Sequence, residues 1–324
     1  MKKLTLTTIA LSVSFAVNAN ELGESGFSGE VSGLIGMSSE TSNFNTDTKK
    51  KTGDLNTKGE SDSGLAAAPL GQIRYTFGSG NSHQVFAGTS RDDLAVGDFV
   101  LELGYKHGFG ENSSIAFSYL PSMGGETWAD PFITGDDREV TDFSSNAYRA
   151  KYDNILDSNF SADFAYYTIE LDKENSGVFQ TGSAIKSLDR DGNGLYSKIS
   201  YSHQLSSNSI LEPSLLYKTF SADGDAMSNT EIGTELTYKA FYGRHAFALS
   251  GKYSSVSFDD THVFFNKKQK DSKFGAFGAY EFDKLMGWEN VSFNALAGYD
   301  VTTSNIEFYE KSELIVGVGA TYKF

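Results

Sequence analysis

"SELIVGVGATYKF", residues 312–324, ends the chain and has the pattern that decides the fold class. Its apolar residues stand at every second position, namely Leu314, Val316, Val318, Ala320, Tyr322 and Phe324. Side chains of a β-strand point alternately to its two faces, so this spacing predicts a strand with one apolar face. An aromatic last residue is unusual, because chain ends are normally polar and frayed. The fold class then depends on whether the rest of the chain repeats the pattern.

The same alternation recurs along the whole chain. It is clear over Phe27–Met37, Phe99–Tyr105 and Ile232–Ala240, where small or polar residues separate the apolar ones. Noisier examples are residues 67–77, 83–91, 114–121, 143–153, 160–170, 195–206, 210–221, 245–257, 273–282 and 291–301. Together with the terminal stretch they make about fourteen segments that have the period of a strand.

The connections between these segments alternate between short and long. The short ones are GSGNS (78–82), GENS (110–113), SSNS (206–209) and YGRH (242–245), and the long, polar ones are residues 39–64, 121–142, 171–194 and 258–272. Two connections depart from this rule. RDD (91–93) is predicted to be a tight turn on the long side, and DKLMGWEN (283–290) a longer turn on the short side.

Alternating strands with short turns at one end and long loops at the other are typical of outer-membrane barrels. A closed sheet also satisfies every backbone polar group in lipid. A soluble β-sandwich would need no such asymmetry. We therefore predict an all-β fold, a transmembrane antiparallel up-and-down β-barrel of 12–14 strands, with 14 as the best estimate. Its short turns are expected to be periplasmic and its long loops extracellular.

Composition and the first residues agree with export. MKKLTLTTIALSVSFAVNANE has two lysines, an uncharged stretch and a small-residue cleavage site, so residues 1–19 are predicted to be a signal peptide and residues 20–324 the outer-membrane barrel. The 27 Lys and Arg against 42 Asp and Glu give −15, and losing Lys2 and Lys3 with the signal peptide gives −17. Such acidity disfavours nucleic acid as a partner. No cysteine is present, so no disulfide framework can form.

The chain end also resembles the C-terminal signal by which barrel proteins are recognised for assembly. Gly319, Tyr322 and Phe324 stand at its glycine and two aromatic positions, although Gly317 stands where a polar residue is usual. The resemblance implies the barrel-assembly machinery as a partner. Phe324 would end the closing strand, with Tyr322 and Phe324 in the aromatic band at the inner interface with the membrane lipid.

Several stretches resemble one known family. They are FSGEVSG (27–33), SNFNTD (42–47), PLGQIRYTFG (69–78), VFAGTSRDDLAVGDFVLELGYKH (85–107) and GETWADPF (125–132). They are similar to an uncharacterised family of Gram-negative outer-membrane proteins, domain of unknown function 2860. The resemblance implies an outer-membrane location, and no catalytic residues.

Charged residues recur on the face of the strands opposite to the apolar one. The predicted lumen-lining residues are Glu30, Arg74, Glu102, Lys106, Arg149, Lys151, Lys198, Glu212, Glu231, Glu235 and Lys239. Charges that face lipid are costly, so these side chains must face water or pair across the lumen. The loop PSMGGETWADPFITGDDREVTD (121–142) adds Asp136, Asp137 and Glu139, which predicts a weakly cation-preferring mouth.

Several motifs were weighed as catalytic or metal sites. RDD (91–93) and FDDTH (258–262) could supply the acidic pairs and the Asp-His pair of an omptin-like hydrolase, but no meeting of these groups follows from the sequence. DRDGNG (189–194) resembles the start of a calcium loop, yet Ser200 stands where that loop needs a glutamate. We therefore expect no enzyme activity, no metal and no cofactor.

The polar lumen favours a porin-like channel for small hydrophilic solutes. The alternative is a closed barrel whose extracellular loops act in surface binding or adhesion, with an omptin-like hydrolase as a minor third possibility. Balanced lumen charges suit a wet pore and a salt-bridged plug equally well. A transporter of hydrophobic solutes would need an inward apolar pocket and usually a plug, and the residues that follow the cleavage site are too few for a plug.

Overall fold

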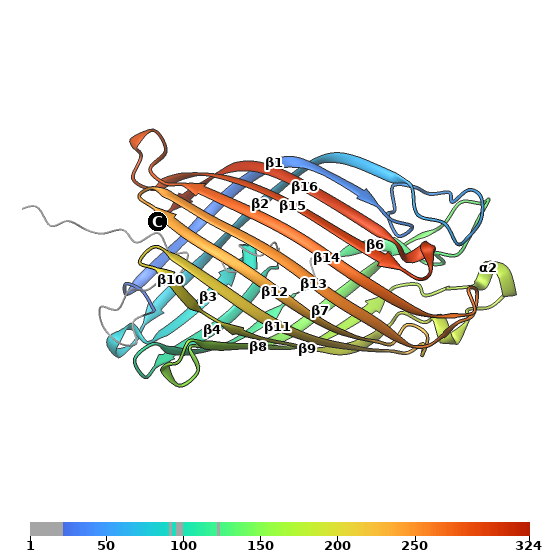
Figure 1. Ribbon diagram of the computed structural model, residues 1–324, viewed down its shortest axis with the longest axis horizontal. Coiled ribbons are helices and arrows are strands. Elements are labelled where there is room, and N and C mark those ends of the chain that lie inside the picture. The colour runs from blue at the N-terminus through green and yellow to red at the C-terminus, as the bar shows by residue number, and fades with distance from the viewer. Residues whose placement is uncertain (1–21, 91–92, 95–99, 122–123) are drawn as a thin grey trace, which may run out of the picture.

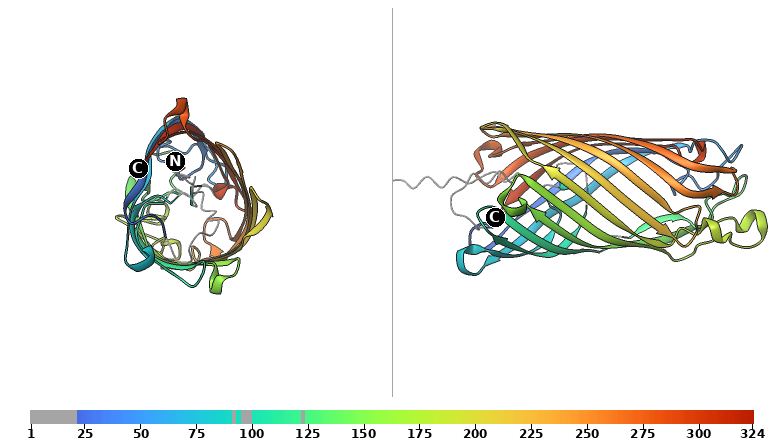
Figure 2. Two further views of the ribbon diagram at one scale, coloured as in Figure 1. Left: turned by 90° about the vertical axis from the view of Figure 1, so that its left-hand side faces the viewer. Right: turned by 60° about the horizontal axis from the view of Figure 1, so that its bottom comes forward.

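The protein is a closed β-barrel (Figure 1; Figure 2). The computed structural model describes residues 22–90, 93–94, 100–121 and 124–324. The predicted signal peptide, residues 1–19, lies outside the described residues. Among the described residues, no helix is long and apolar enough to span a membrane.

The strands follow one another around the barrel in chain order. They are β1 (Gly26–Thr41), β2 (Ser61–Phe77), β3 (His83–Gly88), β4 (Glu102–Phe109), β5 (Ser113–Leu120), β6 (Gly125–Trp128), β7 (Val140–Asp153), β8 (Phe160–Leu171), β9 (Gly192–Tyr201), β10 (His203–Ser206), β11 (Ser209–Ala222), β12 (Asn229–Tyr242), β13 (His245–His262), β14 (Lys267–Phe282), β15 (Val291–Ser304) and β16 (Lys311–Lys323). The short helices in the connections are η1 (Ser79–Asn81), η2 (Ile155–Asp157), α2 (Val178–Thr181), η3 (Lys186–Leu188), η4 (Leu285–Gly287) and η5 (Glu307–Tyr309).

The sheet is antiparallel throughout and closes on itself, because β16 pairs with β1. β5 and β6 both pair with β7, and β9 and β10 both pair with β11, so each of these two pairs forms a single strand of the barrel. The sixteen labelled strands therefore make fourteen crossings of the barrel wall. The predicted fold class and the strand number of 14 are confirmed.

The last residue belongs to the seam that closes the barrel. The Phe324 amide donates to the Gly29 carbonyl at 3.0 Å, and the Gly29 amide donates to the Phe324 carbonyl at 2.8 Å. Glycine lets the two strands approach closely here, since a Cβ on Gly319 would lie 2.1 Å from the Gly33 carbonyl oxygen. The terminal aromatic residue thus extends the ladder between β16 and β1 by one more pair.

The outer face of the wall has the profile of a lipid-facing surface. Aliphatic side chains such as Ile35, Leu215 and Leu249 are exposed in its middle band. Aromatic side chains flank this band, at the periplasmic end Phe27, Tyr75, Tyr105, Phe160, Tyr322 and Phe324, and at the extracellular end Tyr119, Tyr148, Tyr166, Tyr217, Tyr253 and Tyr299. Two aromatic bands around an aliphatic one are the interface girdles of a membrane barrel.

Several strands continue beyond the outer girdle. On β13, the outward positions after Tyr253 are Ser255, Ser257, Asp259 and Thr261, all of them exposed. The predicted long loop 258–272 is therefore wrong, since β13 and β14 occupy most of it and only residues 263–266 join them. The alternation disappears from the sequence there because water, and no longer lipid, faces the outer side of the strand.

The outward face of β13 offers a test of where the lipid ends. Leu249→Arg should lower the free energy of unfolding by about 2–4 kcal/mol, because it places a charge in the lipid-facing band. Ser257→Arg, on the same face of the same strand, should change it by less than about 1 kcal/mol. Denaturant unfolding of the barrel in lipid vesicles measures both. Equal costs for the two substitutions would contradict the assigned boundary of the lipid.

Candidate functional site

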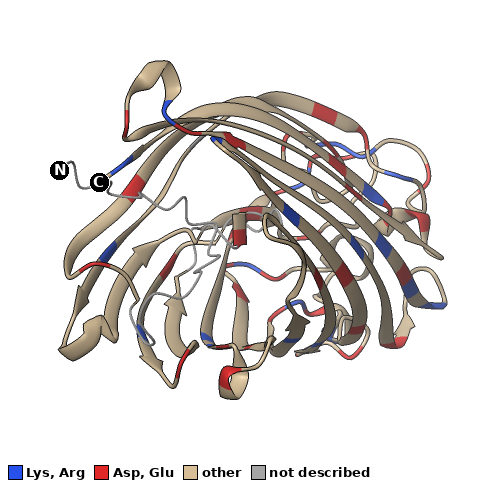
Figure 3. Cartoon of the chain, turned by 60° about the vertical axis from the view of Figure 1, so that its left-hand side comes forward, with Lys and Arg blue, Asp and Glu red and all other residues tan. Residues whose placement is uncertain are grey.

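Charged residues of both signs occur at positions on many of the strands around the barrel (Figure 3). The predicted lumen residues alternate with exposed apolar ones, as Glu235 does with Leu236, so they lie on the inner face. Many form ion pairs between strands: Lys106 with Asp153 at 2.7 Å, Lys198 with Glu235 at 3.1 Å, Lys239 with Glu212 at 3.6 Å and Glu231 with Lys273 at 2.8 Å. Glu30 on β1 and Arg74 on β2 share this face. Their lining of a conducting path stays a prediction.

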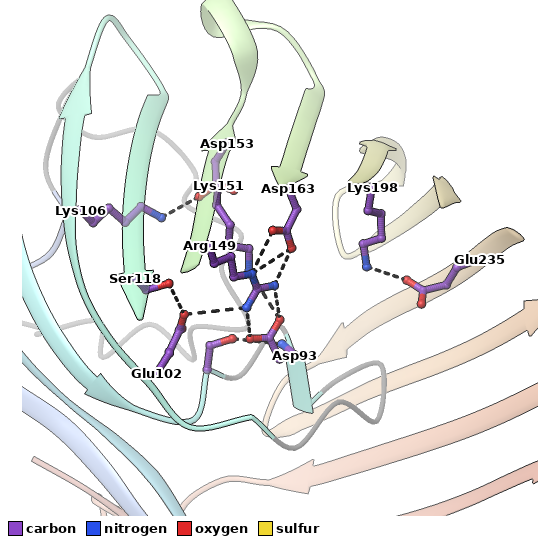
Figure 4. A network of polar contacts seen from close by, with 11 residues as sticks. Asp93, Glu102, Lys106, Ser118, Arg149, Lys151, Asp153, Asp163, Lys198 and Glu235 are labelled. Carbon is purple, nitrogen blue, oxygen red and sulfur yellow. Dashed lines mark hydrogen bonds and ion pairs between the residues drawn. The ribbon is translucent and has the colours of Figure 1, made fainter. Parts of the chain in front are cut away.

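Arg149 on β7 is the centre of the densest polar network (Figure 4). Its Nη1 and Nη2 donate to the two carboxylate oxygens of Asp93 at 2.8 and 2.9 Å. Its Nε and Nη2 donate to Asp163 on β8 at 2.9 and 2.6 Å. Glu102 approaches Nη1 at 3.8 Å, and Lys151 lies 3.6 Å from Asp93. The guanidinium therefore holds two carboxylates in bidentate contacts, the strongest geometry for such pairs.

Asp93 reaches Arg149 because the chain leaves the sheet between β3 and β4. β3 ends at Gly88 and β4 begins at Glu102, so the predicted tight turn RDD (91–93) is wrong, and the predicted strands on either side of it are too long. Residues 91–92 and 95–99, including Phe99, lie outside the described residues. The Asp93 carboxylate lies inside the barrel, where Arg149 compensates the cost of removing it from water (Figure 4).

Burial varies along the interior wall. The side chain of Arg149 is 10% exposed, and that of Lys239, which lies outside the Arg149 network, is 13% exposed. Those of Lys106, Lys252 and Lys273 are 29%, 32% and 41% exposed. The interior is therefore closely packed around Arg149 and accessible to water at some of its other ion pairs.

The long extracellular loops pack around an apolar core, which we call the outer cap. Phe132, Leu188, Ile306 and Phe308 are at most 1% exposed, and they come from the loops before β7, β9 and β16. Partly buried residues of three further connections or strand ends join them, namely Phe44, Leu55, Ala222, Phe264 and Phe265. The expectation that these loops are polar is wrong, because short apolar and aromatic clusters of several loops meet in space.

Arg138 ties the predicted mouth loop to the loop between β1 and β2. Its guanidinium donates to the backbone carbonyls of Asn43 and Thr48 and lies over the ring of Trp128 at 4.3 Å. Burial lowers the pKa of Arg138 to about 10, and burial together with the nearby Arg138 lowers the pKa of Lys51. Both cations lie next to a polar pocket of about 70 Å³.

The predicted mouth residues lie on both sides of Arg138 in the sequence. Asp136 and Asp137 are exposed, whereas Glu139 forms an ion pair with Lys173. Their effect on ion selectivity stays a prediction.

The two motifs that were weighed as catalytic have other partners. Asp93 of RDD contacts Arg149, and His262 of FDDTH is buried in the outer cap, where its Nε2 lies 2.8 Å from the Tyr309 hydroxyl. The Phe264 amide donates to His262 Nδ1 at 3.3 Å, so the hydrogen of the neutral ring is assigned to Nε2. Within the described residues, no cluster of His, Asp and Glu could hold a metal. The absence of enzyme activity stays a prediction.

The predicted assembly residues lie together at the periplasmic end. Tyr322 and Phe324 are exposed on the outer face, and their rings stack with centroids 6.3 Å apart. The Phe324 ring covers Gly29, where a Cβ would come within 2.9 Å of Cζ. Recognition by the assembly machinery stays a prediction.

His262 makes the outer cap sensitive to pH. Burial lowers its pKa to about 4 from an ordinary value of 6.5, so the folded cap holds the neutral ring. Above pH 6.5 the cap keeps the full contribution of the neutral ring to its stability. This contribution falls as the pH is lowered toward 4, and below pH 4 the total loss of stability is on the order of 3 kcal/mol. The hydrogen-exchange protection factors of residues 306–309, which are corrected for the intrinsic exchange rate at each pH, should therefore fall between pH 7 and pH 4. His262→Gln, which cannot titrate, should remove this part of the pH dependence, and an unchanged fall of the protection factors would contradict the assignment.

Phe324→Ser should impair assembly more than it impairs the finished barrel. The change removes the terminal aromatic side chain and keeps the backbone pair with Gly29. We expect reduced outer-membrane levels in cells and near-normal unfolding after refolding in vitro. Phe27→Ser, which removes an exposed aromatic side chain from the same girdle, is the matched control. Equal outer-membrane levels for both variants and the parent would argue against a recognition role.

Comparisons with known proteins place the chain in a family. A search of the curated proteins gives no match. Solved structures similar to the chain include CymD, a monoaromatic hydrocarbon channel, at 10% identity, with 93% of this chain and 89% of that chain covered and a TM-score of 0.45. DcaP, an outer membrane channel of Acinetobacter baumannii, is 10% identical, with 95% of this chain and 100% of that chain covered and a TM-score of 0.42. In-vitro folded OmpT, an outer membrane protein of Vibrio cholerae, is 11% identical, with 94% of this chain and 100% of that chain covered and a TM-score of 0.41. The family model for proteins of unknown function DUF2860 matches residues 26–323, and the chain therefore belongs to that family.

Proposed function

We propose that the protein is an outer-membrane channel for small hydrophilic solutes. The observation that carries this proposal is the partial exposure of paired charges inside the barrel, such as Lys106, Lys252 and Lys273. A salt-bridged plug would bury these side chains on all sides. Their access to water indicates a hydrated space along the wall, through which ions and polar solutes can diffuse.

The Arg149 network fills part of this space with packed side chains. Barrels of about eight strands are filled by their own side chains, and those of 16–18 strands leave an aqueous channel. A barrel of fourteen strands lies between these limits. The packed contacts of Asp93 and Asp163 with Arg149 reduce its interior further, so we expect a low conductance.

Ion preference follows from the exposed charges of the mouth. Lys173 offsets Glu139, and the other exposed acids of this loop are Glu126, Asp136, Asp137 and Asp142. Charges in water are screened beyond about 8 Å at physiological ionic strength. We propose a weak preference for cations that fades as the salt concentration rises.

The outer cap supports a second candidate, a closed barrel whose loops act in surface binding or adhesion. Its core orders loops that would otherwise be mobile, and an ordered surface suits a binding role. No catalytic role is proposed, because His262 and Asp93 are held by Tyr309 and Arg149.

Single-channel recording in planar bilayers tests the channel directly. The parent protein should give steady openings of low conductance. Asp93→Ala should raise the conductance, because it frees Arg149 of one of its two bidentate partners. Glu212→Ala removes an inner-wall carboxylate that contacts Lys239 and not Arg149, so it should leave the conductance nearly unchanged. A correctly folded barrel without openings would reject the channel and favour the surface-binding candidate.

A further inference from the structure

We propose that the barrel interior has an apolar site, here called the lumen patch, that binds small uncharged amphiphiles such as phenols. The patch is formed by Leu34 on β1, Leu70 on β2, Ala248 on β13, Phe277 on β14 and Leu296 on β15, with Leu94 beside them. These residues line a pocket of about 100 Å³. A role of this site in transport rests on the proposed channel function, whereas binding to the site does not.

The patch residues face the interior and not the lipid. On β1 the neighbour Ile35 is 67% exposed on the outer face, and on β13 the neighbour Leu249 is 60% exposed there. Leu34 and Ala248 have the opposite parity and therefore point inward. Phe277, which is 7% exposed, alternates in the same way with the outward Phe274.

The patch is continuous across neighbouring strands. Ala248 is the register partner of Ala279, and Ala279 is the partner of Leu296. A purely hydrated lumen gains nothing from a wall of this kind, because apolar surface in contact with water is unfavourable. Apolar cavities of about 150 Å³ lined by Leu, Ile and Phe stay dry and bind benzene. A pocket of this size and lining therefore suits a single ring or a short alkyl chain.

The rim of the pocket selects against anionic ligands. Its charged members, Glu30 and Glu281, are both carboxylates, which disfavour an anionic solute. Lys323 lies 2.5 Å from Glu281, so that carboxylate already has a cation. The uncharged polar members of the lining are Ser32, Asn294 and Thr321, whose side chains hydrogen-bond to one another at 2.6 Å, so the polar side of the pocket beside the two carboxylates carries no cation of its own among the described residues.

The position of the patch puts it next to the Arg149 network. Leu94 lines the patch on the wall formed by β13–β2, and the adjacent Asp93 contacts Arg149 on the opposite wall. A solute that passes the Arg149 network must therefore come close to the patch. The ring of an amphiphile can pack against Phe277 and Leu296 while its hydroxyl faces the polar side of the lumen.

The test is direct binding of 4-fluorophenol to the protein in lipid nanodiscs, followed by ¹⁹F NMR line broadening, with empty nanodiscs as the blank. We expect saturable binding to the parent, and weaker binding of 4-fluorobenzoate. Ala248→Asp should weaken 4-fluorophenol binding at least tenfold. Ala116→Asp is the matched control and should leave binding unchanged, since Ala116 lies on the inner wall between Lys106 and Lys151 and outside the patch. If Ala248→Asp fails to fold, Leu296→Asn gives the same comparison.

Three outcomes would overturn the site: no saturable binding by the parent, equal loss in the Ala248 and Ala116 variants, or equal binding of the benzoate. The first would also be the result if the chain's own apolar side chains already filled the pocket. Because the measurement needs no current, binding without conductance would reject the channel and keep the site. Conductance without binding would keep the channel and reject the site.

Discussion

The fold depends on the requirement that every backbone amide and carbonyl inside the membrane find a partner within the sheet. The seam between β1 and β16 meets it, and its register extends from Thr41 opposite Ser312 to Glu30 opposite Lys323. Phe324 and Gly29 add one further pair at the periplasmic end. An open edge here would expose unpaired groups to lipid, so the whole barrel relies on the last residues of the chain. The terminal aromatic residue is thus both part of the wall and part of its interface with lipid.

Closure of the wall leaves an interior whose two sides differ. The wall around β7 and β8 is charged and centred on Arg149, whereas the wall from β13 to β2 is apolar around Phe277 and Leu296. Asp93 contacts Arg149 on the charged side, and the next residue, Leu94, lines the pocket on the apolar side. The departure of the chain from the sheet after Gly88 therefore places one polar and one apolar contact across the lumen. A hydrated path that passes both is suited to solutes with a polar and an apolar part.

Features that depend on residues close together in the sequence could be predicted, and most of those that depend on residues far apart in the sequence could not. The strands and their number followed from period-two apolarity, which is a local signal. The pair of Arg149 and Asp93 was not predictable, because 56 residues separate them and the contact lies outside the sheet ladder. The outer cap was not predicted because its apolar residues occur in short clusters of separate loops, such as PFI (131–133) and IEFY (306–309), and nothing local in the sequence shows that these clusters meet. The lumen patch did leave a signal, since HAFALS (245–250) and FGAFGAY (274–280) are apolar or small on both faces of their strands.

The outer cap limits how a hydrophilic solute can reach the lumen. Its core fully buries Phe132, Leu188, Ile306 and Phe308, and each such side chain stabilises by about 1.5–3 kcal/mol. Opening the core would cost on the order of 6–12 kcal/mol, so thermal fluctuations seldom open it. In the proposed channel, a solute path would therefore follow the polar side of the cap, where the pocket beside Lys51 and Arg138 lies. These two cations oppose the exposed aspartates of the mouth, which is a reason for any cation preference to be weak.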